Sequence, residues 1–169
     1  MRHDGGKWKE WTGWAFVEGH WLRRKHFTKP FLDEVARRIA EGERAHPGEL
    51  MLAIEAVSPG HERDTRLRAL EVFGRLRVWD TPGNSGVLLY MALDRHSIEL
   101  VADRGVPVPD DQWAQVCANL RTDLQFGRYT DGVLAAIDAI EAKLAEHCPR
   151  LPGVQGGGIN ALDDRPVLL

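Results

Sequence analysis

Apolar residues recur with helical spacing in several parts of the chain. A first helix is predicted to begin at Thr28 and Pro30, with apolar side chains three or four positions apart, and to end at HisProGly, 46–48. The same period returns in residues 61–77, where arginines lie opposite one apolar side formed by Leu67, Leu70, Phe73 and Leu76. Two more helices are predicted, one after ProValProAspAsp at 107–111 and one after Thr130.

Three short apolar runs predict strands. The first is LMLAIEAV, residues 50–57, which SerProGly closes. The second is GVLLYMAL, residues 86–93, which follows the break ProGlyAsnSerGly. AspArgHis at 94–96 separates it from the third run, SIELVAD, so the last two strands form a hairpin.

Length and composition fit one globular domain with tails. The chain has 169 residues, of which 43% are hydrophobic and 28% charged. We expect an N-terminal arm at 1–27, a domain at 28–149, and a Gly-rich linker and C-terminal tail at 150–169. GVQGGG in the linker has neither a strand before it nor a helix after it, so it does not indicate a nucleotide-binding loop.

Charge and cysteine content narrow the functional classes. The formal net charge is −3, which gives no reason to expect nucleic acid as the main partner, although the first 29 residues are rich in Lys and Arg. Cys117 and Cys148 form neither a CxxC pair nor a zinc-site spacing. The N-terminus lacks the apolar run of a signal peptide, and no apolar stretch approaches the length of a transmembrane segment. These features predict a soluble cytoplasmic protein.

Several segments resemble the TPM-domain family: HPGELMLAIEA, RALEVFGRLRVWDTPGNSGVLLYMAL and IELVADRGV, with the closing DRPVLL. The resemblance covers residues 28–149 and is greatest to a small soluble bacterial branch. It implies a single-domain α/β fold, a three-layer α/β/α sandwich around a small mixed sheet. It also suggests acid phosphatase activity, which has been assigned to some plant members, and a membrane-associated pathway with a LemA-type protein as a possible partner.

Polar residues flank the predicted strands at one edge of the sheet. With a right-handed parallel crossover, the first two strands begin at the edge where the third strand ends. We therefore expect one rim to collect Glu49, Asp80, Asn84 and Asp103, with Thr81 and Arg104 beside them. Carboxylate and amide oxygens suit Ca²⁺ or Mg²⁺. In the alternative interpretation, the two Asp side chains cap loops while Arg104 pairs with an acid.

Known hydrolase signatures are missing from the sequence, and no catalytic residue is assigned. Neither cysteine has an arginine six positions later, as a phosphotyrosine-type nucleophile requires. The sequence also lacks a DxDx[TV] aspartyl nucleophile, a GxSxG elbow and an HExxH motif. Metal assistance is therefore the remaining route to phosphate hydrolysis.

The arm combines tryptophans with basic residues, a composition suited to a membrane interface or a partner groove. The candidate contact residues are Trp8, Trp11, Trp21, Arg23 and Arg24. Gly13 and Gly19 weaken the prediction of a helix here. The alternative is that these aromatic residues fold back onto the domain, because exposed tryptophans reduce solubility.

Three hypotheses follow for function. The first is a divalent-cation-binding interaction module without catalytic activity, linked to a membrane-associated process. The second is a metal-dependent phosphatase with Asp103, Asp80 and Glu49 as ligands. The third is a peripheral membrane protein that binds through the N-terminal arm.

Overall fold

The computed structural model describes residues 14–148 and 161–169, with side chains described from Val17 onward. These residues form α2 (Trp14–His26), α3 (Lys29–Gly42), β1 (Glu49–Glu55), α4 (Thr65–Arg75), β2 (Gly86–Ala92), β3 (Ser97–Ala102), α5 (Asp110–Gln125), α6 (Tyr129–His147) and β4 (Val167–Leu168). The predicted order of helices and strands in the domain is confirmed. Trp8, Trp11 and the GVQGGG linker lie outside the described residues.

The sheet is mixed, with strand order β3-β2-β1-β4. β1 and β2 are parallel and in register from Glu49 opposite Gly86, whereas β2 and β3 form the predicted antiparallel hairpin. The closing residues add a fourth strand that the sequence pattern does not predict. Ala53 of β1 lies opposite Val167 of β4 in a short parallel pairing.

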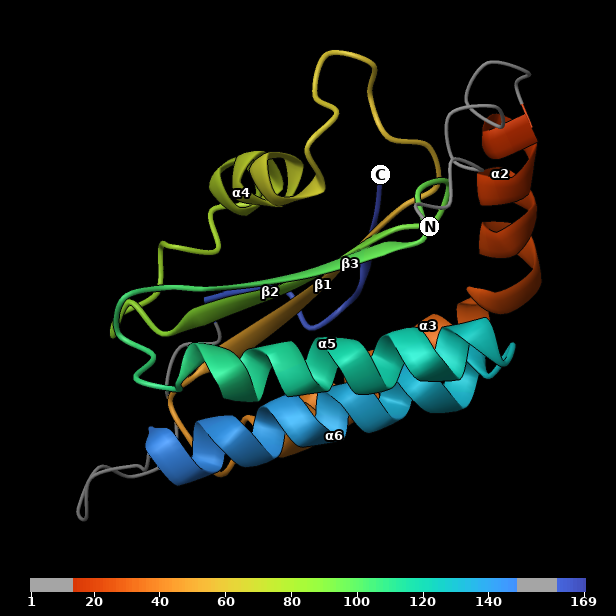
Figure 1. The fold of residues 1–169 in the computed structure, drawn as a ribbon. Coiled ribbons are helices and arrows are strands. Elements are labelled where there is room, and N and C mark those ends of the chain that lie inside the picture. The colour runs from red at the N-terminus through yellow and green to blue at the C-terminus, as the bar shows by residue number, and fades with distance from the viewer. Residues whose placement is uncertain (1–13, 149–160) are drawn as a thin grey trace.

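The sheet lies between two layers of helices (Figure 1), with α4 on one face and α3, α5 and α6 on the other. Side chains alternate between these faces, because successive residues of a strand point to opposite sides. Leu50 and Leu52 join the larger core beneath α3, α5 and α6, whereas Met51 and Ala53 join the smaller core beneath α4. The predicted three-layer sandwich is confirmed.

Helix α4 buries a different side from the one its leucines suggest. Leu67 and Leu70 are 51% and 44% exposed, whereas Arg68 is only 4% exposed. The Arg68 guanidinium donates to both carboxylate oxygens of Glu55, at 2.6 and 3.0 Å, and the Tyr90 hydroxyl donates to the same carboxylate. Burying this ion pair turns Arg68 toward the sheet and leaves the leucines facing outward.

Helix α2 packs against the domain. Leu22 belongs to the larger core, and Glu18 lies 3.3 Å from the imidazole of His96. Gly19 allows the close approach, because a Cβ at this position would lie 1.8 Å from the carbonyl oxygen of Ala56. The glycine that weakens the helix prediction is thus a packing requirement. None of the helices in the described residues is long and apolar enough to cross a membrane.

Candidate functional site

The backbone brings the predicted rim together. The Glu49 N–H donates to the carbonyl of Ser85 at 3.1 Å, which joins the start of β1 to the turn before β2. The Gly105 N–H, just beyond β3, donates to the carbonyl of Asn84 at 2.8 Å. Gly105 has to be glycine, because a Cβ there would lie 2.1 Å from the carbonyl oxygen of Gly83. The two strand starts and one strand end therefore meet at one edge.

Asn84, Asp103 and Arg104 form a polar cluster at this edge, the Asp103 corner. Asp103 Oδ1 accepts a hydrogen bond of 2.7 Å from the backbone N–H of Arg104. Its Oδ2 is buried and has no hydrogen-bond partner among the described residues. Asn84 occupies the left-handed region, with φ 49°, and its Oδ1 accepts from Arg104 Nη2 at 3.3 Å. The corner thus holds an unpartnered carboxylate oxygen of Asp103 and an amide oxygen of Asn84 that Arg104 contacts.

The other rim residues have separate roles in the structure. The carboxylate of Glu49 accepts hydrogen bonds from the backbone N–H groups of Ala161 and Leu162, at 3.0 and 2.6 Å. The Thr81 hydroxyl is buried and accepts from the Ser85 N–H at 2.8 Å, so it closes the turn before β2. Asp80 is exposed, and its carboxylate lies 4.0 Å from Arg77. The side chains of Glu49 and Thr81 thus accept hydrogen bonds from backbone N–H groups, whereas that of Asp80 faces solvent.

A cation at the Asp103 corner would have few protein ligands. Within residues 14–148 and 161–169, no three His, Cys, Asp or Glu side chains are grouped so that they could hold a metal ion. Hard cations also bind through one or two carboxylates, carbonyl oxygens and several waters. The Asp103 carboxylate and the Asn84 amide oxygen fit this type of site. The Arg104 guanidinium would have to give up Asn84 Oδ1, because like charges repel.

A second polar cluster, which the sequence does not single out, lies where α3 and α6 meet the start of β1. The buried imidazole of His46 contacts the carbonyl of Gly48 at 3.1 Å and the carboxylate of Glu141 at 2.6 Å. Because a carbonyl only accepts, the proton facing Gly48 belongs to Nδ1, and a further proton is shared between Nε2 and Glu141. Burial raises the pKa of Glu141.

Glu43 extends this cluster toward the sheet. Its carboxylate accepts a hydrogen bond of 3.0 Å from the Leu50 N–H. Burial raises the pKa of Glu43 to about 8, and the nearby acids Asp164, Glu141 and Glu49 add to the rise. The cluster was missed because HisProGly indicates a helix stop and Glu43 and Glu141 fit exposed helix positions. Only the tertiary fold brings these side chains together.

Neither cysteine has the environment of a nucleophile. Burial raises the pKa of the Cys117 thiol, with a smaller contribution from the charge of Glu99. Burial also raises the pKa of Cys148. A raised thiol pKa lowers the fraction of reactive thiolate near neutral pH. Cys117 packs against the larger core, as its place on an apolar helix face predicts.

The fold and the rim define a single-domain α/β/α sandwich with a polar strand edge. A family model described as the TPM domain matches residues 26–143, and the chain belongs to this family. Comparison with curated proteins gives no match.

Two solved structures show the same fold. The NMR structure of the BA42 protein from the psychrophilic bacterium Bizionia argentinensis is 23% identical, with a TM-score of 0.72. The similarity covers 84% of this chain and 94% of that one. The N-terminal domain of a protein from P. gingivalis is 17% identical, with a TM-score of 0.63, covering 75% of this chain and 83% of that one.

Proposed function

We propose that this TPM domain is a non-catalytic interaction module that binds a divalent cation at the Asp103 corner and serves a membrane-associated process. The observation that carries the proposal is Asp103 Oδ2, a buried carboxylate oxygen without a hydrogen-bond partner among the described residues. A buried carboxylate oxygen without a donor is costly, and a cation supplies the missing partner. Asn84 adds an uncharged oxygen, and water completes the coordination.

Two features of the described residues support a non-catalytic role. The thiols of Cys117 and Cys148 have raised pKa values, which disfavours thiolate chemistry. Both oxygens of the Glu49 carboxylate accept hydrogen bonds from backbone N–H groups. The carboxylate is therefore poorly placed to act as a general base or to contact a substrate. A metal-dependent phosphatase at the same corner is the alternative function.

Calorimetric titration with Ca²⁺, Mg²⁺ and Mn²⁺ tests the proposal. We expect saturable binding by the native chain and its loss in Asp103→Asn, with the fold confirmed by circular dichroism. Asp80→Asn is the matched control, because Asp80 belongs to the same rim but is exposed and lies beside Arg77. Equal binding by the native chain and Asp103→Asn, or no binding at about 1 mM cation, would contradict the proposal.

An assay of para-nitrophenyl phosphate hydrolysis distinguishes a non-catalytic module from a metal-dependent phosphatase. The module predicts no turnover in the presence of the bound cation. Cation-dependent turnover that disappears in Asp103→Asn and persists in Asp80→Asn would instead establish the phosphatase. In that reaction the cation would polarise a phosphoryl oxygen and activate water.

A second candidate function, peripheral membrane binding, is favoured by the outer face of α2. Val17 and Trp21 lie one helical turn apart and are 62% and 53% exposed. Lys25 lies one turn further, with its Nζ 4.5 Å from the centre of the Trp21 ring, and the last turn also contains Arg23 and Arg24. An exposed aromatic residue among cations suits an anionic lipid surface.

Sedimentation with vesicles of phosphatidylcholine and phosphatidylserine tests this second candidate. Trp21→Ser should reduce binding to the anionic vesicles. Trp79→Ser is the matched control, since Trp79 is 49% exposed and lies outside α2. Equal loss in both variants, or binding unaffected by Trp21→Ser, would rule out a membrane contact through this helix.

A further inference from the structure

The edge of β3 presents backbone groups that the sheet leaves unpaired. β3 is the terminal strand, and the Asp103 N–H donates to the carbonyl of Gly86 at 2.9 Å. In an antiparallel pair, residues alternate between bonding the neighbouring strand and facing away from it. The N–H and C=O groups of Ile98, Leu100 and Ala102 therefore point outward, toward the free edge.

One side chain confirms this alternation and partly covers the edge. Arg66 of α4 donates to the carbonyl of Leu100 at 2.6 Å, so this carbonyl faces away from β2. Long charged side chains commonly protect an exposed strand edge. No other hydrogen bond to the outward groups of Ile98, Leu100 and Ala102 occurs in the described part of the chain. The edge thus keeps most of its capacity to pair.

A groove follows this edge. An open depression of about 480 Å³ lies between β3 and α5, with Trp113, Ala114 and Cys117 of α5 on its helix side. A smaller cavity of about 100 Å³ adjoins it at the opposite end of the strand. The two hollows share Ile98 and Arg121 and together accompany β3 from the Asp103 end to the hairpin turn.

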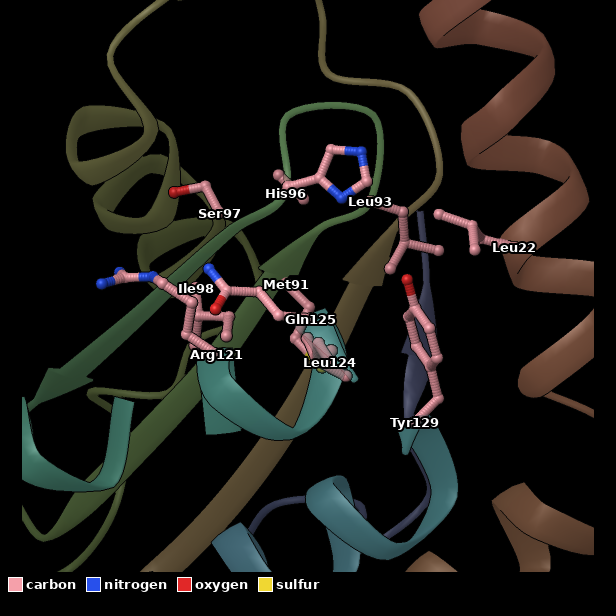
Figure 2. A pocket seen from close by; sticks show the side chains of 11 residues that line it. Leu22, Met91, Leu93, His96, Ser97, Ile98, Arg121, Leu124, Gln125 and Tyr129 are labelled. Carbon is pink, nitrogen blue, oxygen red and sulfur yellow. The ribbon is translucent and has the colours of Figure 1, made fainter. Parts of the chain in front are cut away.

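The smaller cavity has an apolar interior and a charged entrance. Leu22, Leu93 and Tyr129 converge on it from α2, the β2–β3 turn and α6 (Figure 2). Its size suits one aliphatic or aromatic side chain. Arg121 lines the entrance, is exposed, and has neither a hydrogen bond nor an acid partner among the residues that the structure describes. At the far end of the groove, Asp103 and Asp110 supply negative charge.

We propose that the β3 edge binds an extended peptide segment of a partner protein by strand addition. The unpaired N–H and C=O groups provide the backbone bonds, and the smaller cavity takes an apolar anchor side chain. Charge complementarity selects an acidic residue two positions from the anchor, on the same face of the added strand and facing Arg121. It also selects a basic residue four positions further along, facing Asp103 and Asp110. This surface is separate from the outer face of α2, and it shares only Asp103 with the proposed cation site. Peptide binding requires no bound cation.

A fluorescently labelled peptide with the one-letter sequence LTEVTVK, acetylated and amidated, is the probe, because its Leu, Glu and Lys share one face of an extended strand. Its control is LTKVTVE, which exchanges the two charges, and fluorescence anisotropy with the intact chain measures both. We expect the native chain to prefer the first peptide by at least about fivefold, from a charge contact of roughly 1 kcal/mol. Arg121→Glu should reverse the preference, whereas Arg75→Glu, which makes the same charge change on the exposed part of α4, should not.

Amide hydrogen exchange gives the structural readout. Peptide binding should slow exchange at Ile98, Leu100 and Ala102, because strand addition forms hydrogen bonds with these three N–H groups. No saturation at about 1 mM peptide, protection elsewhere without protection of these amides, or indifference to Arg121→Glu would overturn the proposal. So would protection of the same amides by self-association of the chain in the absence of peptide, because a second copy would then be the occupant.

Discussion

Glu49, at the first position of β1, accepts a hydrogen bond of 2.6 Å from the backbone N–H of Leu162, a residue 113 positions later in the chain. The second carboxylate oxygen accepts from Ala161. These bonds fix the approach of the C-terminal segment, which then pairs with β1 as β4. A side chain predicted as a metal ligand therefore anchors the last strand.

Replacing Glu49 by Gln should loosen this segment. The amide keeps one acceptor oxygen but turns an NH₂ group toward a backbone donor, so one charge-assisted bond is lost. We expect the free energy of unfolding to fall by about 2 kcal/mol in urea titrations and hydrogen exchange to quicken in residues 161–169. In a chain truncated after residue 160, the same substitution should cost much less. An equal cost in both backgrounds would show that Glu49 stabilises something other than this segment.

Removing only Arg68 from the buried Arg68–Glu55 ion pair should lower stability more than neutralising both residues. Arg68→Met leaves a buried carboxylate without its counter-charge, and we expect a loss of about 3–5 kcal/mol in the free energy of unfolding. Adding Glu55→Gln should recover much of this loss, because the uncharged amide is cheaper to bury and the Tyr90 hydroxyl can still donate to it. Chemical denaturation of both variants measures the difference. A loss below about 1 kcal/mol for Arg68→Met would contradict the buried ion pair.

Gly19→Ala should displace α2 without unfolding the sheet. The added methyl group would meet the Ala56 carbonyl at 1.8 Å, which forces the helix away from the loop after β1. Proteolysis within α2 and faster hydrogen exchange there are the expected results, with β1 and β2 still protected. Gly74→Ala is the control, since its methyl group meets nothing within 4 Å and should be tolerated. Identical behaviour of the two variants would refute the close contact.

Glu43 should make stability depend on pH. Its pKa is raised from 4.5 to about 8, chiefly by burial, so the folded state holds the proton more tightly than the unfolded chain. The contribution of Glu43 to the free energy of unfolding is fully present below pH 4.5 and is lost as pH rises through about 8. Glu43→Gln should flatten this fall and raise Tm at about pH 9 by at least about 2 °C relative to the native chain, with little change near pH 5.

Two comparisons complete the pH test. Glu141 also has a raised pKa, so part of the slope should persist in Glu43→Gln. Glu146→Gln is the control, because the Glu146 side chain is 62% exposed and should leave the profile unchanged. A native profile that is flat between about pH 5 and pH 9 would contradict the raised pKa of Glu43.

Local pattern was sufficient for the main elements of the fold. The apolar runs around Leu52 and Leu89 mark buried strands, and the turn at 94–96 marks the hairpin. The parallel crossover also placed Asn84 and Asp103 at one edge correctly. β4 was missed because two residues paired across a long chain separation leave no periodic signal.

Side-chain partners were harder to predict, because distant residues decide them. The leucines of α4 favour one buried side, yet the carboxylate of Glu55 draws Arg68 inward and determines the helix orientation. Likewise, Glu49 follows a strand-edge pattern typical of ligands, but the C-terminal segment supplies its donors. The spacing of residues along the sequence reveals neither the Arg68–Glu55 ion pair nor the bonds from the C-terminal segment to Glu49.

Nitrogen–proton correlation spectra recorded during a Ca²⁺ titration are the most direct test of the cation-binding module. We expect saturable shifts at about 1 mM Ca²⁺ or below, concentrated in the amides of residues 83–86 and 103–105, and absent in Asp103→Asn. Unchanged spectra, or shifts that are scattered over the surface and persist in Asp103→Asn, would contradict a cation site at the Asp103 corner.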